Sequence, residues 1–166
     1  MHLMIRPTTE HDWEAVRKLR LEMVRDTPMG FAESYETALT HDEAEWRRRG
    51  ARGTAPTSVA FAAIADDERW IGTMAGYIED GRPLLVGVYV TPDFRGEAGV
   101  ADALLAAVEN WAAQHGDTIT LHVHADNARA RRYYDKQGYT ATGVTLPYVL
   151  NATETEIEMA KRLPAG

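Results

Sequence analysis

The spacing of apolar residues predicts that the chain begins with a short strand and continues as a helix. The strand is expected over residues 3–6, and an apolar stripe at intervals of three and four begins soon after Thr9. The stripe consists of Trp13, Val16, Leu19 and Met23. Pro28 and Gly30 interrupt this pattern, and a second short helix is expected over residues 42–49.

Alternation of apolar and polar residues dominates the middle of the chain. It predicts three consecutive strands in an antiparallel meander, over residues 58–65, 70–78 and 84–91. The remaining expected elements are a helix over 99–115, a strand over 118–125, a helix from 127 to 138, and strands over 139–145 and 154–163. This order indicates one α/β (α+β) domain over residues 1–166, with a mostly antiparallel sheet of roughly six or seven strands and about four helices.

The composition restricts the partners of the chain. Its formal charge of −7 disfavours nucleic acid or an anionic membrane as a partner and is compatible with a cationic substrate. The chain contains no cysteine, which excludes thiolate nucleophiles, disulfides and cysteine-based metal sites. The sequence shows neither a secretory signal nor a long apolar segment, so we expect a cytoplasmic protein.

The segment from Val88 to Leu105 combines a β-branched strand, a glycine-containing loop and a helix. The first turn of a helix presents about four backbone amides without partners, together with a partial positive charge, and both suit a phosphate. Gly96 and Gly99 allow the loop to close on an anion, and Arg95 adds a guanidinium group. An ordinary strand-to-helix turn is the alternative interpretation of this segment alone.

A second motif follows the strand that contains Leu121 and Val123. It reads Asn127-x-x-Ala130-x-x-x-Tyr134-x-x-x-Gly138-Tyr139. In order and spacing, the two segments resemble the GNAT superfamily of acyl-CoA-dependent N-acetyltransferases. The loop from Arg95 to Gly99 is one residue longer than the family pattern.

The resemblance implies acetyl-CoA as the co-substrate, with no metal, and assigns its binding to the two motifs. The implied contacts come from the strand, the loop, the first turn of the following helix and the start of the second helix: Val88, Tyr89, Val90, Arg95, Gly96, Glu97, Ala98, Gly99, Val100, Ala101 and Asn127. In the family, a bulge in the strand before the loop frees backbone amides for the thioester oxygen. Glu97 is expected to point to solvent, because a carboxylate beside a diphosphate is unfavourable.

Acyl transfer from a thioester to an amine needs a base for the amine and a proton donor for the departing thiolate. The resemblance assigns the donor role to Tyr134, with Tyr133, about 100° away around the helix, as the alternative. His122 and His124 share one face of a strand, and His124 is the first choice for the base. Glu33 and a chain of water molecules are the alternatives. A metal site is disfavoured because no third ligand is identified, and two purely structural histidines are equally compatible with the sequence.

The segment over residues 31–39 is too apolar for a simple linker and is expected to cover the acceptor site. The expected acceptor is a primary amine of a small molecule or a peptide, which attacks the thioester directly in a ternary complex. Its expected contacts, beside Tyr89, are Phe31, Tyr35, Tyr77 and Tyr148. A non-catalytic acyl-CoA-binding or regulatory module of the same fold is the alternative. An exposed final strand is compatible with a homodimer.

Overall fold

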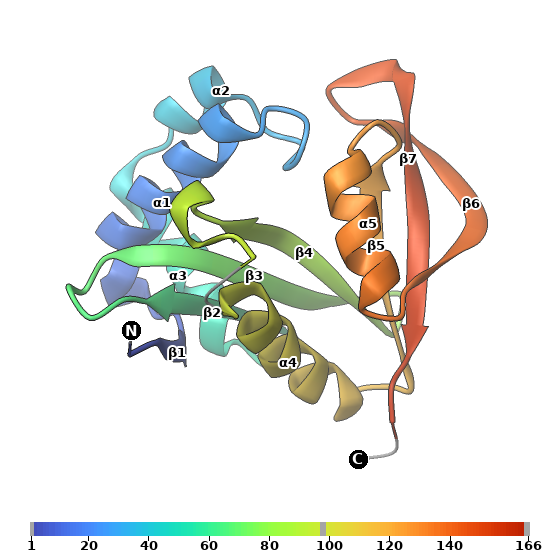
Figure 1. Cartoon of the computed structure of the whole chain (residues 1–166). Helices are drawn as coiled ribbons and strands as arrows, with labels where there is room; N and C mark the ends of the chain where they lie inside the picture. Colours follow the sequence, from blue (N-terminus) through green and yellow to red (C-terminus); the bar gives the residue numbers. More distant parts are fainter. Residues whose placement is uncertain (1, 97–98, 165–166) are drawn as a thin grey trace.

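The computed structural model describes residues 2–96 and 99–164, which form one sheet of seven strands in the order β1-β2-β3-β4-β5-β7-β6 (Figure 1). The strands are β1 (Met4–Pro7), β2 (Ser58–Ile64), β3 (Trp70–Glu79), β4 (Arg82–Val90), β5 (Thr118–His124), β6 (Thr140–Tyr148) and β7 (Asn151–Arg162). Neighbouring strands are antiparallel except for the pair β4 and β5. The expected α/β fold with a mostly antiparallel sheet is confirmed.

The described residues also contain five α-helices and three short 3₁₀ helices. They are α1 (Trp13–Asp26), α2 (Tyr35–Leu39), α3 (Glu43–Ala51), α4 (Val100–Ala113) and α5 (Ala128–Lys136), with η1 (Glu10–Asp12), η2 (Arg52–Thr54) and η3 (Pro92–Phe94). The helix beyond the expected four is α2, which lies in the segment expected to be a connector. It forms there because Ser34 Oγ accepts a hydrogen bond from the Thr37 amide and thereby caps the helix.

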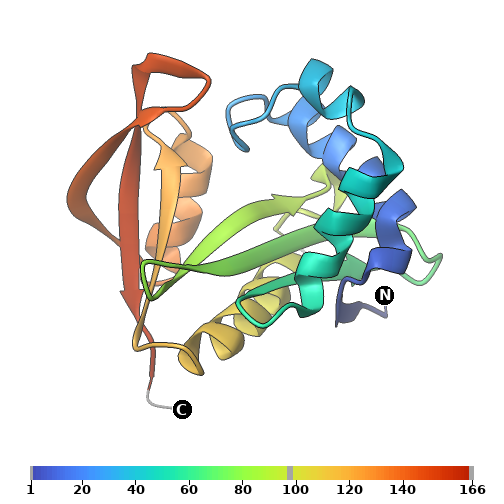
Figure 2. The same cartoon turned by 180° about the vertical axis from the view of Figure 1, so that it is seen from behind.

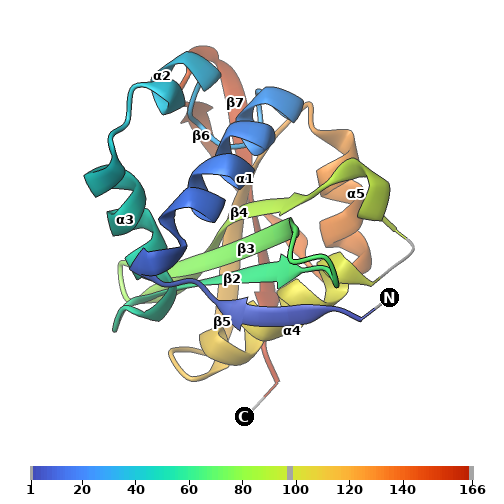
Figure 3. The same ribbon diagram turned by 90° about the vertical axis from the view of Figure 1, so that its left-hand side faces the viewer.

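Helices cover both faces of the sheet (Figures 1 and 2). The helix α4 packs against β1 to β5, and its residues Leu104, Leu105 and Val108 are buried in the main core. The helix α5 lies on the same face, where Tyr134 joins that core. The helices α1 and α3 cross the opposite face of the half formed by β2 to β4, as Figure 3 shows from the side. The helices α1 and α3 thus cover one face of the sheet, and α4 and α5 cover the other face.

The parallel strands β4 and β5 separate after a short contact. Their pairing comprises Leu84 with Thr120 and Leu85 with Leu121, and beyond this point the strands diverge. On its other edge, β4 contains one extra residue relative to β3 between Val86 and Tyr89, which forms a bulge at Gly87 with φ +60°. The divergence leaves the backbone of β4 after Leu85 without a strand on its β5 side among the described residues.

Candidate active site

A cavity of about 600 Å³ opens where β4 and β5 diverge. Its walls come from β4, the loop after β4, the first turn of α4, the end of β5, α5 and the segment before α2. The sequence-predicted residues that line it are Phe31, Val88, Tyr89, Val90, Arg95, Gly96, Gly99, Val100, Ala101, His124, Asn127 and Tyr134. Glu97 and Ala98 were also predicted there, but they lie outside the described residues. The structure thus brings the two sequence motifs to one cavity.

Two glycines with positive φ shape the loop between β4 and α4. Gly96 has φ +85° and Gly99 has φ +67°, a region of backbone space that other residues adopt only with strain. Gly99 is the N-cap of α4, and, being a glycine, it has no side chain to cap the amides of the first turn. Because Val100 and Ala101 line the cavity, these amides are available there to an anion.

The side chain of Arg95 lines the cavity and is hydrogen-bonded to two other parts of the protein. Its Nε donates to the carbonyl oxygen of Val90 at 2.7 Å, and its Nη2 donates to Oδ2 of Asp26 at 2.6 Å. The hydrogen bond from Arg95 lowers the pKa of Asp26. The guanidinium group therefore connects the loop after β4 to the end of α1.

Tyr134 projects from α5 into the wall of the cavity and is 6% exposed. Its hydroxyl makes no hydrogen bond to another of the residues that the structure describes, whereas the hydroxyl of the adjacent Tyr133 donates to Asp102 Oδ1 at 3.0 Å. Burial raises the pKa of Tyr134, so its hydroxyl keeps its proton at neutral pH. Of the two tyrosines, Tyr134 has the hydroxyl that remains free to donate to a ligand.

The two histidines of β5 both line the cavity but differ in their hydrogen bonding. His124 is buried, its Nδ1 accepts from the Asp126 amide at 3.1 Å, and its Nε2 therefore carries the hydrogen and donates to Glu154 Oε1 at 2.6 Å. His122 is 27% exposed, and its nearest carboxylate, Glu158, lies 3.7 Å away, beyond hydrogen-bonding distance. Both ring nitrogens of His124, the first choice for the base, are thus hydrogen-bonded within the protein. The imidazole of His122 is more available to accept a proton from a ligand.

The four aromatic residues expected at the acceptor site occupy different places. Phe31 lines the cavity, and Tyr148 lies behind the wall, with its ring edge-on to His124 at 4.9 Å. Tyr35 is the first residue of α2 and lies beneath the guanidinium of Arg25, outside the cavity. Tyr77 is 40% exposed on β3 and pairs with Leu84, before β4 and β5 diverge. The structure therefore separates Tyr35 and Tyr77 from the site.

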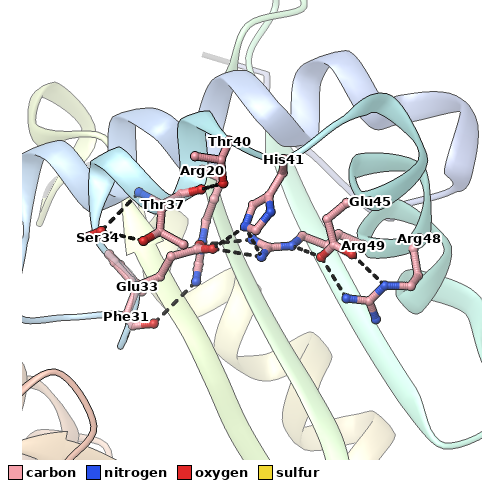
Figure 4. Close-up of polar contacts among 10 residues, drawn as sticks. All are labelled: Arg20, Phe31, Glu33, Ser34, Thr37, Thr40, His41, Glu45, Arg48 and Arg49. Carbon is pink, nitrogen blue, oxygen red and sulfur yellow. Dashed lines mark hydrogen bonds and ion pairs between the residues drawn. The ribbon is translucent and has the colours of Figure 1, made fainter.

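Glu33, the alternative base, does not line the cavity and is held by Arg20, Arg49 and His41 (Figure 4). Burial raises its pKa, but hydrogen bonds from Arg49, Arg20 and His41 outweigh this effect and hold the pKa well below the usual range of a glutamate. A carboxylate stabilised so strongly as an anion is a poor proton acceptor. The structure does not support Glu33 as the base.

The cavity also contains charged residues that the motifs did not single out. Arg129 and Lys136 of α5 line it, together with Asp102 of α4. The basic character of α5 was visible in the sequence, but no arginine stood out from its neighbours. Helical spacing offered a signal, since Arg129, Tyr133 and Lys136 recur at intervals of four and three and so share one face of α5. Arg131 instead donates to the Ala125 carbonyl at 2.9 Å.

The histidines of β5 do not extend into a recognisable metal centre. Across residues 2–96 and 99–164, no three histidine, aspartate or glutamate side chains gather in an arrangement that could hold a metal ion. The carboxylates beside His122 and His124 are Glu158 and Glu154, one for each imidazole. The same part of the chain contains no helix with the length and apolar character needed to cross a membrane.

A mixed sheet that opens between its parallel strands, with a helix N-terminus on one side of the opening and a buried tyrosine on the other, defines an acetyltransferase-type α/β fold. The chain belongs to the Acetyltransferase (GNAT) family, whose model matches residues 13–139. The family resemblance seen in the sequence is thus confirmed. No curated protein sequence gives a significant match to the chain.

Solved structures share this fold. The structure is similar to the PaiA N-acetyltransferase from Thermoplasma acidophilum in complex with coenzyme A, with TM-score 0.72, 18% identity and coverage of 98% of this chain and 99% of that chain. It is similar to Arabidopsis thaliana NAA60 in complex with a bisubstrate analogue, with TM-score 0.71, 18% identity and coverage of 99% and 100%. Nourseothricin acetyltransferase shares 25% identity over 66% of this chain and 67% of that chain, with TM-score 0.60.

Proposed function

We propose that the chain transfers an acetyl group from acetyl-CoA to a primary amine of a small molecule or a peptide. The amine attacks directly in a ternary complex, without a covalent enzyme intermediate. The observation that carries the proposal is the convergence on one cavity of the unpaired β4 backbone, the first turn of α4 and the hydroxyl of Tyr134. Similar folds in complex with coenzyme A and with a bisubstrate analogue support it.

The cavity fits the chemistry of coenzyme A, which joins an amide-containing arm to a diphosphate. The backbone of Val88 to Val90 would pair with the arm as an added strand does. The amides of Gly96 and of the first turn of α4 would bind the diphosphate. Arg129 and Lys136 supply positive charge on the α5 side, where they suit a further phosphate of the nucleotide.

The chain's own residues would carry out the proton transfers. Acetyl-CoA, when bound, supplies the thioester whose acetyl group the amine takes up. The bulge at Gly87 turns the strand so that an amide of Tyr89 or Val90 can donate to the thioester oxygen as negative charge develops there. Tyr134 donates a hydrogen bond to the departing sulfur, and His122 accepts the proton of the amine directly or through water.

Calorimetric titration of acetyl-CoA and free CoA tests the binding half of the proposal. The Gly99→Trp variant places an indole at the N-cap of α4, and we expect it to abolish binding. The control is Gly81→Trp, because Gly81 also has positive φ and open space around it but lies in the turn between β3 and β4. Equal loss of binding in both variants would show damage to the fold rather than to the loop.

Release of free thiol with a panel of amines tests the catalytic half. We expect amine-dependent release by the wild type and strongly reduced release by Tyr134→Phe. Binding of acetyl-CoA without release for any amine would favour the non-catalytic acyl-CoA-binding module. If the wild type does not bind acetyl-CoA, both the acetyltransferase function and the non-catalytic module are rejected.

A further inference from the structure

We propose that Glu33 is a positioning residue that holds Phe31 against the cavity, and that Phe31 selects acceptors with an apolar group close to the reacting amine. This inference rests on the proposed acetyltransferase function and extends it to the class of acceptor. The two residues are separated by a single alanine, yet they lie in different surroundings. Phe31 lines the cavity, whereas Glu33 lies in a cluster formed by the cations Arg20 of α1 and Arg49 of α3 and by His41, which lies between α2 and α3 (Figure 4).

Glu33 is contacted by three basic side chains although it lies outside regular secondary structure. Its Oε1 accepts from Arg20 Nε at 2.8 Å and from Arg49 Nη1 at 3.0 Å. Its Oε2 lies 2.8 Å from both Arg49 Nη2 and His41 Nε2. Its side chain is only 10% exposed, so these contacts are shielded from solvent. The segment before α2 is therefore fixed to α1 and α3 at this point.

Arg20 carries the constraint from Glu33 to Phe31. While its Nε binds Glu33, its Nη2 donates to the Phe31 carbonyl at 3.4 Å. The same guanidinium lies 5.3 Å from the centre of the Phe31 ring. The other side of the contact is Tyr89 of β4, whose ring meets Phe31 edge-on at a centroid distance of 6.1 Å. Phe31 is thus held between the cation cluster and the strand that is proposed to bind the thioester.

The backbone between the two residues is strained, which argues for a defined position of Phe31. Ala32 has φ +53°, a left-handed conformation that costs a non-glycine residue on the order of 1 kcal/mol. The strained residue turns the chain between the cavity and the cluster. Such a conformation persists only when contacts in the folded protein hold it in place, and the hydrogen bonds of the neighbouring Glu33 do so here.

The position of Arg20 also indicates which acceptors Phe31 suits. An aromatic ring attracts a ligand ammonium through its π face, but here a guanidinium already lies over the Phe31 ring. A second cation beside it would meet repulsion from Arg20. The ring therefore offers the cavity an apolar wall rather than a cation site. Amines with an apolar group near the nitrogen fit this wall better than polyamines.

Hydrogen exchange tests the positioning role without requiring an acceptor. Glu33→Gln removes the charge and keeps the size of the side chain. We expect exchange of amides in residues 27–34 to rise by roughly tenfold or more, because charged hydrogen bonds of this kind contribute that factor to an equilibrium. The matched control is Glu45→Gln, since Glu45 also binds Arg49 but makes no contact with Arg20 or Phe31. Equal exchange in the two variants overturns the proposal.

Steady-state thiol release tests the acceptor class with three probes, phenylalanine amide, alanyl-alanine amide and spermidine. For Glu33→Gln and for Phe31→Ala we expect a higher KM for phenylalanine amide, an unchanged Kd for acetyl-CoA and little change for spermidine. Phe31→Ala, which keeps every side chain of the cluster around Glu33, serves if Glu33→Gln fails to fold, and should raise the same KM. A uniform change for all three amines, or a preference of the wild type for spermidine, overturns the proposal. Failure of the wild type to bind acetyl-CoA is a separate result that rejects the acetyltransferase function itself.

Discussion

Arg95 Nη2 and Asp26 Oδ2 lie 2.6 Å apart although the two residues are separated by 69 positions in the chain. Their ion pair joins the loop after β4 to the last residue of α1. Arg95 also binds the carbonyl of Val90, so the direction in which the chain leaves β4 depends on the same side chain. A substitution of Asp26 is therefore expected to alter the loop that forms the proposed diphosphate site, although Asp26 is not part of that loop.

Asp26→Asn is expected to weaken acetyl-CoA binding by about two- to fivefold, because partly exposed ion pairs contribute up to about 1 kcal/mol. Isothermal calorimetry measures the change. The control is Asp93→Asn, which removes an exposed carboxylate from η3 in the same stretch of chain. An affinity unchanged by Asp26→Asn would contradict the role of the ion pair.

Tyr134→Phe is expected to lower kcat by about a hundredfold, a typical effect of removing one proton donor. Its thermal stability should change little, because its hydroxyl bonds none of the residues described. Tyr139→Phe provides the contrast, since the Tyr139 hydroxyl donates to Glu109 at 2.7 Å in the core. That variant should lose about 1–3 kcal/mol of stability and keep its kcat. Thiol release measures kcat and urea unfolding measures the stability of both variants.

Substitution of the two β5 histidines should separate a kinetic effect from a structural one. His122→Ala is expected to lower kcat by roughly a hundredfold with little loss of stability. His124→Ala removes the hydrogen-bond partner of the Asp126 amide and of Glu154 Oε1, and should cost about 2–3 kcal/mol in the free energy of unfolding. If His124→Ala folds normally and only its kcat falls, the assignment of the base returns to His124.

Glu33 should make the stability of the protein sensitive to acid. Because its pKa is lower in the folded state than in the unfolded state, ionised Glu33 contributes fully above the unfolded value of about 4.3. This contribution is lost as the pH falls towards the lowered folded pKa. Glu33→Gln should therefore destabilise by about 3 kcal/mol at neutral pH, as the loss of a buried ion pair does. The difference from the wild type should shrink in urea unfolding below about pH 4. A difference independent of pH would contradict this account.

The sequence predicted the elements well because its local signals were clear. The helix after the glycine loop and the helix after Asn127 were both expected within about two residues of their bounds. Asparagine is a preferred residue at a helix N-cap, and Oδ1 of Asn127 accepts from the Ala130 amide. The two motifs converge on one cavity because each combines a strand with the helix that follows it, an order that places loops and helix starts at one end of a sheet.

Long-range contacts account for what the sequence analysis missed. Nothing near Arg95 in the chain indicates Asp26, and nothing near Glu33 indicates Arg20 and Arg49. Tyr77 was assigned to the acceptor site from its residue type, but its register opposite Leu84 places it before the strands diverge. Which side chains form ion pairs and which residues face each other across two strands depend on the assembled fold. A local sequence pattern therefore does not predict them.

The divergence of β4 and β5 also gives the molecule a sheet edge in its interior. An ordinary outer edge invites another protein strand, with the attendant risk of aggregation. Here the edge begins at the closed end formed by Leu84 and Leu85 and lies beneath α4 and α5, so that a polypeptide with side chains on both faces meets these walls. A narrow chain with amide groups and few branches fits between them. The fold can therefore keep unsatisfied backbone groups for its substrate while denying them to neighbouring copies of itself.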